Sequence, residues 1–299
     1  NVSAPNSKFV RSATTLKFLE TGLFNVSVIS EDATFKLFER FGFQSGRDVD
    51  KFEGMVGFQK AANGINYVTQ GTNAYISAPS SYCSSSSSAS GTFDFNITNS
   101  IWESAGKLAF ESQSVNATVN FDLVKSVLNT GSHLVFGVSR GEVVIDNSNV
   151  NVGTSRQIEN QSTMTIKNGS VVNGAVATSE NAKNPGILIV ENATYAVTGE
   201  FSGSDLGTGN IIFKKGASFT AGSITKANIQ IDATGMAAGD EINLTANLSN
   251  LAGSLTVVNN DNLDASIVDG KIVLAVKPVA KIGETKYATL EEAFAAAAE

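Results

Sequence analysis

The chain has 299 residues, of which 42% are hydrophobic and only 16% are charged. This length and hydrophobic content are enough to bury a substantial core, which excludes disorder of the whole chain. The formal net charge is -7, and no Lys/Arg cluster of the kind that nucleic-acid binding requires is present, so we expect no nucleic-acid partner.

The first part of the chain, residues 1–90, is predicted to form a Phe-rich N-terminal cap with an irregular segment. Phe35, Phe38 and Phe41 are spaced as on one face of a helix, whereas the segment before them alternates like a strand. A cap is expected here because the first coil of a stack would otherwise expose an apolar cross-section. Residues 80–90 are mostly serine and are predicted to form an exposed loop.

From residue 91 onward, short β-rich runs recur at a nearly fixed period. Hydrophobic anchors stand 21 to 24 residues apart, at Ile97, Phe121, Ile145, Ile166, Val190 and Phe213. A repeat of about 23 residues cannot bury its own hydrophobic face, so neighbouring repeats must stack, with equivalent strands pairing in parallel about 4.8 Å apart. We therefore predict an all-β fold, with a parallel β-solenoid (β-helix) over residues 91–276.

The repeat becomes looser after Ile229, where we expect either irregular coils or an antiparallel finish that ends at Pro278. The strand spacing alone would also permit a pair of antiparallel β-sandwiches. Residues 277–299 are predicted to form a linker and a short C-terminal α-helix. Thr289 and Glu292 have the spacing of a capping box, and the alanines that follow favour a helix.

An asparagine recurs two residues after four of the anchors, at Asn99, Asn147, Asn168 and Asn192. In a stack these side chains would align into a ladder of amides, and asparagine also tolerates the left-handed conformation that a tight corner needs. A row of glycan-binding amides is the functional alternative. We favour the structural interpretation.

The residue directly after each later anchor is charged, which predicts a column of charges on the outer face. Its members are Asp122, Asp146, Lys167, Glu191 and Lys214. Opposite signs alternate from Asp146 onward, and such cross-strand pairs stabilise a sheet modestly. The enzymatic alternative makes Asp122 and Asp146 a pair of catalytic carboxylates for glycoside hydrolysis. No general-acid signature accompanies them.

The other chemically distinctive residues give no pattern of a catalytic or metal site. His133 is the single histidine, so it cannot build a metal cluster, and we expect a solvated residue at a strand start. Cys83, the single cysteine, lies in the serine-rich stretch without a neighbouring base. Trp102, Tyr75 and Tyr82 could stack on sugars, but isolated aromatic residues are common on such surfaces. We predict no catalytic, cofactor-binding or metal-binding residues.

The repeats also carry a resemblance to a known family. Ile166-Lys-Asn-Gly-Ser-Val171, with glycines at Gly174, Gly199 or Gly222 marking turns, resembles the degenerate repeats of right-handed parallel β-helices in bacterial adhesin-like and autotransporter-passenger surface proteins. Residues 279–299 look like the hairpin and helix that open β-helix domains in large gut-bacterial surface proteins. That likeness implies a further domain after this segment. A helix docked on the end of the solenoid is the alternative.

These observations predict a non-catalytic extracellular protein of the cell surface, secreted and processed. Its role would be that of a structural stalk, an adhesin, or a self-assembling filament or surface-layer subunit. The expected partners are copies of the same chain, in head-to-tail or lateral contact, or cell-surface glycans. We expect no cofactor and no membrane span in this chain. The alternative is a carbohydrate-active enzyme, a polysaccharide lyase or glycoside hydrolase, which rests on fold analogy alone.

Overall fold

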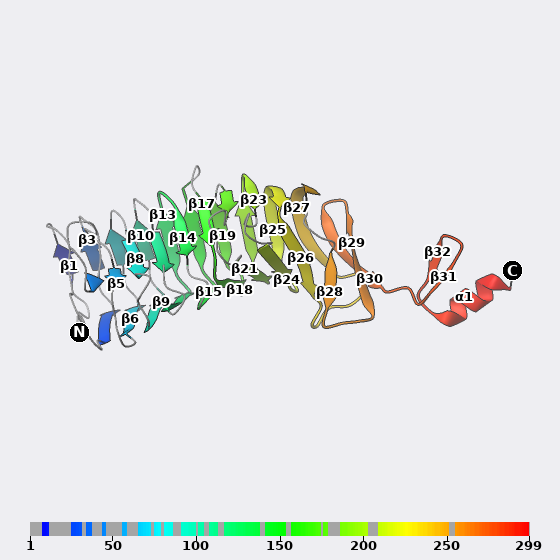
Figure 1. Ribbon diagram of the computed structural model, residues 1–299, viewed down its shortest axis with the longest axis horizontal. Coiled ribbons are helices and arrows are strands. Elements are labelled where there is room, and N and C mark those ends of the chain that lie inside the picture. Colours follow the sequence, from blue (N-terminus) through cyan, green and yellow to red (C-terminus); the bar gives the residue numbers. More distant parts are fainter. Residues whose placement is uncertain are drawn as a thin grey trace.

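The protein is a parallel β-solenoid followed by a small hairpin and helix (Figure 1). The computed structural model describes strands between residues 8 and 99, and then residues 101–104, 108–112, 117–137, 141–153, 157–174, 176–178, 186–202, 209–250 and 255–298. Each regular coil contributes three strands, one to each of three faces, and all pairs between coils are parallel.

The first face is a sheet of ten strands. These are β2 (Asn25–Glu31), β6 (Ile65–Thr72), β9 (Gly91–Thr98), β12 (Ala117–Val124), β15 (Glu142–Asp146), β18 (Thr163–Lys167), β21 (Ile187–Glu191), β24 (Gly209–Phe213), β26 (Ala227–Asp232) and β28 (Thr256–Val258).

The second and third faces are built in the same way and merge near the C-terminal end of the stack. The second contains β1 (Lys8–Arg11), β3 (Thr34–Leu37), β7 (Tyr75–Ala78), β10 (Ile101–Ser104), β13 (Val127–Thr130), β16 (Asn149–Val152), β19 (Val171–Gly174) and β22 (Thr194–Val197). The third contains β4 (Gln44–Ser45), β5 (Val56–Phe58), β8 (Ser81–Ser85), β11 (Leu108–Ser112), β14 (Leu134–Gly137), β17 (Gln157–Asn160), β20 (Val176–Thr178) and β23 (Glu200–Ser202). One long strand, β25 (Ser218–Thr225), pairs with both β22 and β23 and so joins the two faces.

The predicted repeat is confirmed in about five coils of roughly 23 residues, but the anchor predicted at Phe121 is wrong. Ile145 pairs with Ile166, Ile166 with Val190, and Val190 with Phe213, as the anchors require. Ile97, however, pairs with Leu123 and not with Phe121. Phe121 and Leu123 both point inward from β12, so a two-residue error keeps the inward face and changes only the register.

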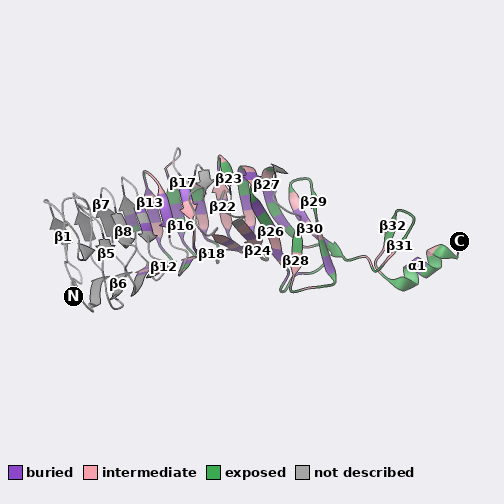
Figure 2. Ribbon diagram, in the orientation of Figure 1, coloured by how far each residue is buried: buried purple, intermediate pink, exposed green. Residues whose placement is uncertain are grey.

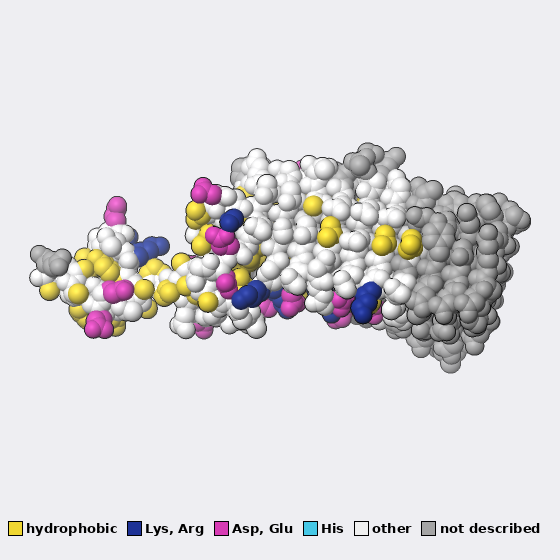
Figure 3. All heavy atoms as spheres, turned by 180° about the vertical axis from the view of Figure 1, so that it is seen from behind, with side chains coloured by type: hydrophobic (Ala, Val, Ile, Leu, Met, Phe, Trp, Pro, Cys, Tyr) yellow, Lys and Arg dark blue, Asp and Glu magenta, His cyan; other side chains and the backbone are white. Residues whose placement is uncertain are grey.

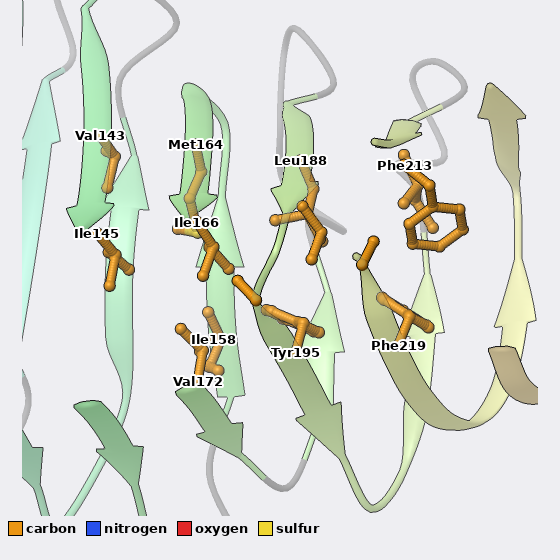
Figure 4. Close-up of a cluster of buried hydrophobic side chains, with 14 of the residues drawn as sticks. Val143, Ile145, Ile158, Met164, Ile166, Val172, Leu188, Tyr195, Phe213 and Phe219 are labelled. Carbon is orange, nitrogen blue, oxygen red and sulfur yellow. The ribbon is translucent and has the colours of Figure 1, made fainter. Parts of the chain in front are cut away.

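Alternation along each strand explains why these segments form a solenoid. In β18 and β21 every second residue is buried, and the others face outward half-buried. The inward residues of successive coils, such as Ile166 and Phe213, stack into one continuous core (Figure 4). Ile166, Val190 and Phe213 are fully buried there. Because a β-strand places alternate side chains on opposite faces, this pattern supplies one wall of the core in every coil.

The N-terminal segment differs from the prediction in two places. The residues of β3, including Phe35, are a strand paired with β1 and β7, so the helical interpretation is wrong there; Phe38 and Phe41 lie outside the described residues. Ser81–Ser85 form β8, which pairs with β5 and β11, and not a loop. Parallel pairing thus already occurs before residue 91, because backbone hydrogen bonds from neighbouring coils hold a strand whose own sequence is mostly serine.

The C-terminal end has the antiparallel finish that was one of the two expected alternatives. β27 (Glu241–Asn250) pairs in parallel with β25 and so continues the stack. β30 (Lys271–Val276) then pairs antiparallel with both β27 and β29 (Leu263–Val268). A hairpin of β31 (Ala280–Ile282) and β32 (Thr285–Tyr287) follows, and then α1 (Leu290–Ala297). Most residues of this last module are exposed, in contrast to the solenoid strands (Figure 2).

The predicted capping box of the helix is confirmed. The Thr289 side chain accepts a hydrogen bond from the Glu292 backbone N–H, and the Glu292 carboxylate accepts one from the Thr289 backbone N–H in return. Glu291 and Glu292 both lie in the first turn, where the helix dipole favours negative charge.

Candidate functional site

The recurring asparagines stand at the corner between the first and second faces. Asn99, Asn147, Asn168 and Asn192 all have positive φ, between 46° and 55°. This confirms that asparagine serves the left-handed corner, because its short polar side chain tolerates a conformation that most residues avoid. In the coil that contains β12, Lys125 takes the same position, two residues after Leu123, with φ 48°.

Beside this corner runs a column of buried serines that the sequence patterns did not single out. Ser126, Ser148 and Ser170 are almost completely buried. The Ser148 hydroxyl accepts a hydrogen bond from the Ser126 N–H (2.9 Å), and the Ser170 hydroxyl accepts one from the Ser148 N–H (3.0 Å). Each hydroxyl also lies within 2.7 Å of a carbonyl oxygen in its own coil, Asp146 for Ser148 and Lys167 for Ser170, so a buried backbone group gains a partner at every step.

Amide-to-amide hydrogen bonds occur in a different column from the predicted one. On the second face, Asn151 Nδ2 donates to Asn129 Oδ1 (2.9 Å) and Asn173 Nδ2 donates to Asn151 Oδ1 (3.2 Å). At the predicted column, Asn168 Nδ2 donates to the Asp146 carboxylate at 2.8 Å. Asparagine side chains also join coils on the first face, where Asn228 Nδ2 donates to Asn210 Oδ1 (3.3 Å).

The charge column is confirmed from Asp146 onward. Lys167 Nζ lies 3.4 Å from the Asp146 carboxylate, and Lys214 Nζ lies 3.4 Å from that of Glu191. The column continues to Asp232, whose carboxylate is 3.9 Å from Lys214 Nζ. Charged side chains accordingly gather in a row along one edge of the solenoid (Figure 3).

Asp122 does not belong to this column. In register it pairs with Asn96 and Val144, whereas the residue opposite Asp146 is Val124. Asp122 and Asp146 are therefore diagonal neighbours on the first face. The Asp146 carboxylate is held by Lys167 and by the Asn168 amide, so its contacts are those of a bond between coils.

Two aspartates flank the turn between β26 and β27: Asp232, which ends β26 in the charge column, and Asp240, directly before β27. Partial burial opposes ionisation of Asp232, but hydrogen bonds from Asn259 (2.9 Å) and Thr234 (2.7 Å) outweigh it and lower the pKa of this carboxyl. The backbone N–H of Ala237 (3.0 Å), and then Lys215, lower the pKa of Asp240. Both carboxylates are thus ionised partners that fix the turn.

Of the remaining candidates, Trp102 and Cys83 lie in positions that differ from the sequence expectations, whereas His133 lies at a strand start as expected. Trp102 is 2% exposed and packs edge-on against Phe110, so it cannot stack on a sugar. Its Nε1 has no hydrogen-bond partner within the described residues. His133 is half-buried directly before β14, and its carbonyl accepts a hydrogen bond from the Leu108 N–H. Cys83 lies in β8, in register with Phe110.

Tyr75 is the first residue of β7, and Tyr82 is the second residue of β8. Within the described ranges, His, Cys, Asp and Glu side chains do not gather in groups of three or more that could hold a metal ion. No helix in the described part of the chain is both long and apolar enough to cross a bilayer.

Comparison with known proteins gives one short similarity. A stretch of 65 residues, 21% of the chain, is 35% identical to the high molecular weight rubredoxin of Moorella thermoacetica and spans 28% of that protein. No protein-family model matches the chain, and no solved structure matches it. The chain covers too little of this relative for the similarity to show a family.

Proposed function

We propose that the chain is a non-catalytic structural protein of the cell surface, an extracellular stalk or adhesin whose solenoid acts as a spacer. The partners in this proposal are copies of the same chain or surface glycans. The resemblance of the repeats to bacterial surface β-helices supports the location, and the repeat architecture supports the role, because a stack of coils makes a rod with regular flat faces.

The observation that carries the proposal is the use that the protein makes of its polar side chains. Two ion pairs join successive coils, one between Asp146 and Lys167 and one between Glu191 and Lys214. The asparagines of the second face and the buried serines likewise bond from one coil to the next. Groups that could do chemistry in an enzyme are here engaged in holding the stack together.

The proposal is tested with the purified chain in two measurements. Negative-stain electron microscopy should show rods, and a panel of acidic and neutral polysaccharides, including polygalacturonate, should be bound or ignored but never cleaved. Immunolabelling of intact source cells should reach the protein without permeabilisation.

The enzymatic alternative gives an opposite and specific result. Cleavage of a polysaccharide that disappears in the Asp122→Asn or Asp146→Asn variant, with the fold intact by circular dichroism, would overturn the structural role. Asp264→Asn, on the exposed hairpin strand β29, is the matched control, because it removes a carboxylate far from both residues in the stack.

A further inference from the structure

The outward side of the first face carries an aliphatic strip next to the charge column. In strands β15, β18, β21 and β24, the register aligns the middle outward residues into one column, Val144, Thr165, Ile189 and Ile212. These four side chains are half-buried. Ile187, in the neighbouring outward column, widens the strip on β21. The strip lies on the outward side of the parallel ten-stranded sheet.

The charges beside the strip alternate in sign, and the same column in reversed order has the opposite sign at every position. From β15 to β24 the column is Asp146, Lys167, Glu191 and Lys214, so the signs are minus, plus, minus, plus. Because the number of charges is even and the signs alternate, the reversed order is plus, minus, plus, minus. A second copy laid on this face in the antiparallel direction therefore presents the opposite sign at each of the four positions.

We infer that the first face binds the same face of a second copy, in an antiparallel dimer whose two-fold axis passes between β18 and β21. In this arrangement Asp146 lies opposite Lys214 of the second copy, and Lys167 lies opposite its Glu191. The same rotation places Val144 over Ile212 and Thr165 over Ile189. The inference rests on the structural role proposed above and gives that role a defined partner.

The charges fix the register and the direction of the dimer. A shift by one coil, about 4.8 Å, would place like charges opposite each other. A parallel copy would place Asp146 opposite Glu142, which lies on the other side of the strip. Like-charge contacts of this kind disfavour the wrong arrangements, while the aliphatic strip supplies the attraction.

The ion pairs within one chain leave room for partners across the interface. The side chains of Lys167 and Asp146 retain 35% and 23% of their exposure, and those of Lys214 and Glu191 retain 34% and 44%. A carboxylate has several acceptor sites and an ammonium group has three donors, so each can bind a neighbour in its own column and one in the second copy.

The next charge in the column does not oppose this register. The Asp232 carboxylate is occupied by Asn259 and Thr234 of its own chain. By the same register it would lie opposite Val124 of the second copy, which is neutral.

Sedimentation velocity of the full chain over a range of concentrations tests the inference. We expect a reversible monomer–dimer equilibrium. Ile189→Asp puts a charge in the centre of the strip and should weaken the dimer by at least about tenfold. The control is Val171→Asp, which places the same charge at a half-buried outward position on the second face and should leave the dimer unchanged.

A charge swap tests the register. Lys167→Glu should weaken association, because the new carboxylate at position 167 faces Glu191 of the second copy. The double variant K167E/E191K should restore it, since opposite signs again meet across the interface although the ion pairs within each chain are broken. Residues 167 and 191 also pair in register within one chain, so the unfolding midpoints of both variants are compared to separate that contact from association.

Three results would overturn the inference: monomers at every concentration, a dimer insensitive to Ile189→Asp, or a double variant no better than the single one. Circular dichroism and the unfolding midpoint establish that each variant is folded. Failure here leaves the structural role intact, because that role is judged by polysaccharide cleavage and surface labelling and not by dimerisation.

Discussion

The solenoid coils and the C-terminal module use the same kinds of residue in opposite ways. In the coils, Ile166, Val190 and Phe213 show no exposure. In the module, Leu290 is 56% exposed and Phe294 is 72% exposed, and α1 buries only Ala293. Figure 3 shows apolar side chains gathered on the surface of this module.

The difference teaches which interactions hold each region. A coil is stable because its neighbours above and below cover its apolar side and pair with its backbone, so its stability is shared along the stack. The hairpin and helix have few residues to bury and depend on local devices such as the capping box and turn hydrogen bonds. Substitutions should therefore have large, shared effects in the first region and small, local effects in the second.

The sharpest contrast is expected between two phenylalanines. Phe213→Ala should lower the free energy of unfolding by about 3–5 kcal/mol, because it empties a fully buried position that packs on Phe219. Phe294→Ala should change it by less than about 0.5 kcal/mol, because this side chain is mostly in solvent. Urea unfolding followed by circular dichroism measures both. Equal effects would contradict the comparison.

Ser148→Ala should have the next largest effect. It removes the acceptor of the buried Ser126 N–H and a hydroxyl donor to a carbonyl, which should cost about 1–3 kcal/mol. Ser266→Ala, on an exposed position of β29, is the control and should cost almost nothing. The same urea titration distinguishes them, and a neutral Ser148→Ala would show that the serine column contributes only packing.

Thr289→Ala should act on the module alone. Loss of the cap should weaken α1 by about 1 kcal/mol, and the solenoid should unfold at the same urea concentration as before. Hydrogen exchange of the amides in residues 290–297 should accelerate, while that of β18 and β21 stays unchanged. Faster exchange in β18 would show that the two regions are coupled.

The smallest expected effect is a dependence of stability on acid pH. The folded pKa values of Asp232 and Asp240 lie below the ordinary value, so their stabilising contribution is present at neutral pH. It is lost as the pH falls from the ordinary value, about 3.9, through the lower folded pKa. Asp232→Asn should reduce the loss of thermal stability between neutral and acid pH. Asp261→Asn, an exposed residue in a turn, should leave that loss as in the wild type.

The parts of the fold that depend on local sequence were predictable. The positive φ of Asn147 and Asn168 follows from the tolerance of asparagine for the left-handed region, and the Thr289 cap follows from the spacing to Glu292. The repeat itself was visible because each coil must contribute inward hydrophobic residues at the same place. The first two features are determined by residues close together in the sequence, and the third by a simple period of hydrophobic residues.

Features that depend on register were not predictable in the same way. Phe121 and Leu123 both suit the inward face, so the sequence could not decide which one pairs with Ile97. This ambiguity placed Asp122 wrongly in the charge column. It also hid the Asn129 ladder and the serine column, whose partners lie about 22 residues away and are brought together only by stacking.

The serine-rich β8 shows a further limit of sequence reasoning. Its residues lack a hydrophobic period, yet the strand pairs in register with β5 and β11. Strand formation there is imposed by the neighbouring coils, because a strand between two existing ones gains hydrogen bonds on both sides. Composition alone predicts a loop for such a segment.

The stacking of coils also determines how the protein responds to mechanical tension. The hydrogen bonds between coils run along the long axis, so a pull on the two ends of the stack loads all coil interfaces in series, and the weakest one gives way first. Each coil that detaches releases about 23 residues, a length of about 75–80 Å when fully extended. Under load the solenoid would lengthen in steps and dissipate energy, so the whole stack would not unfold at once.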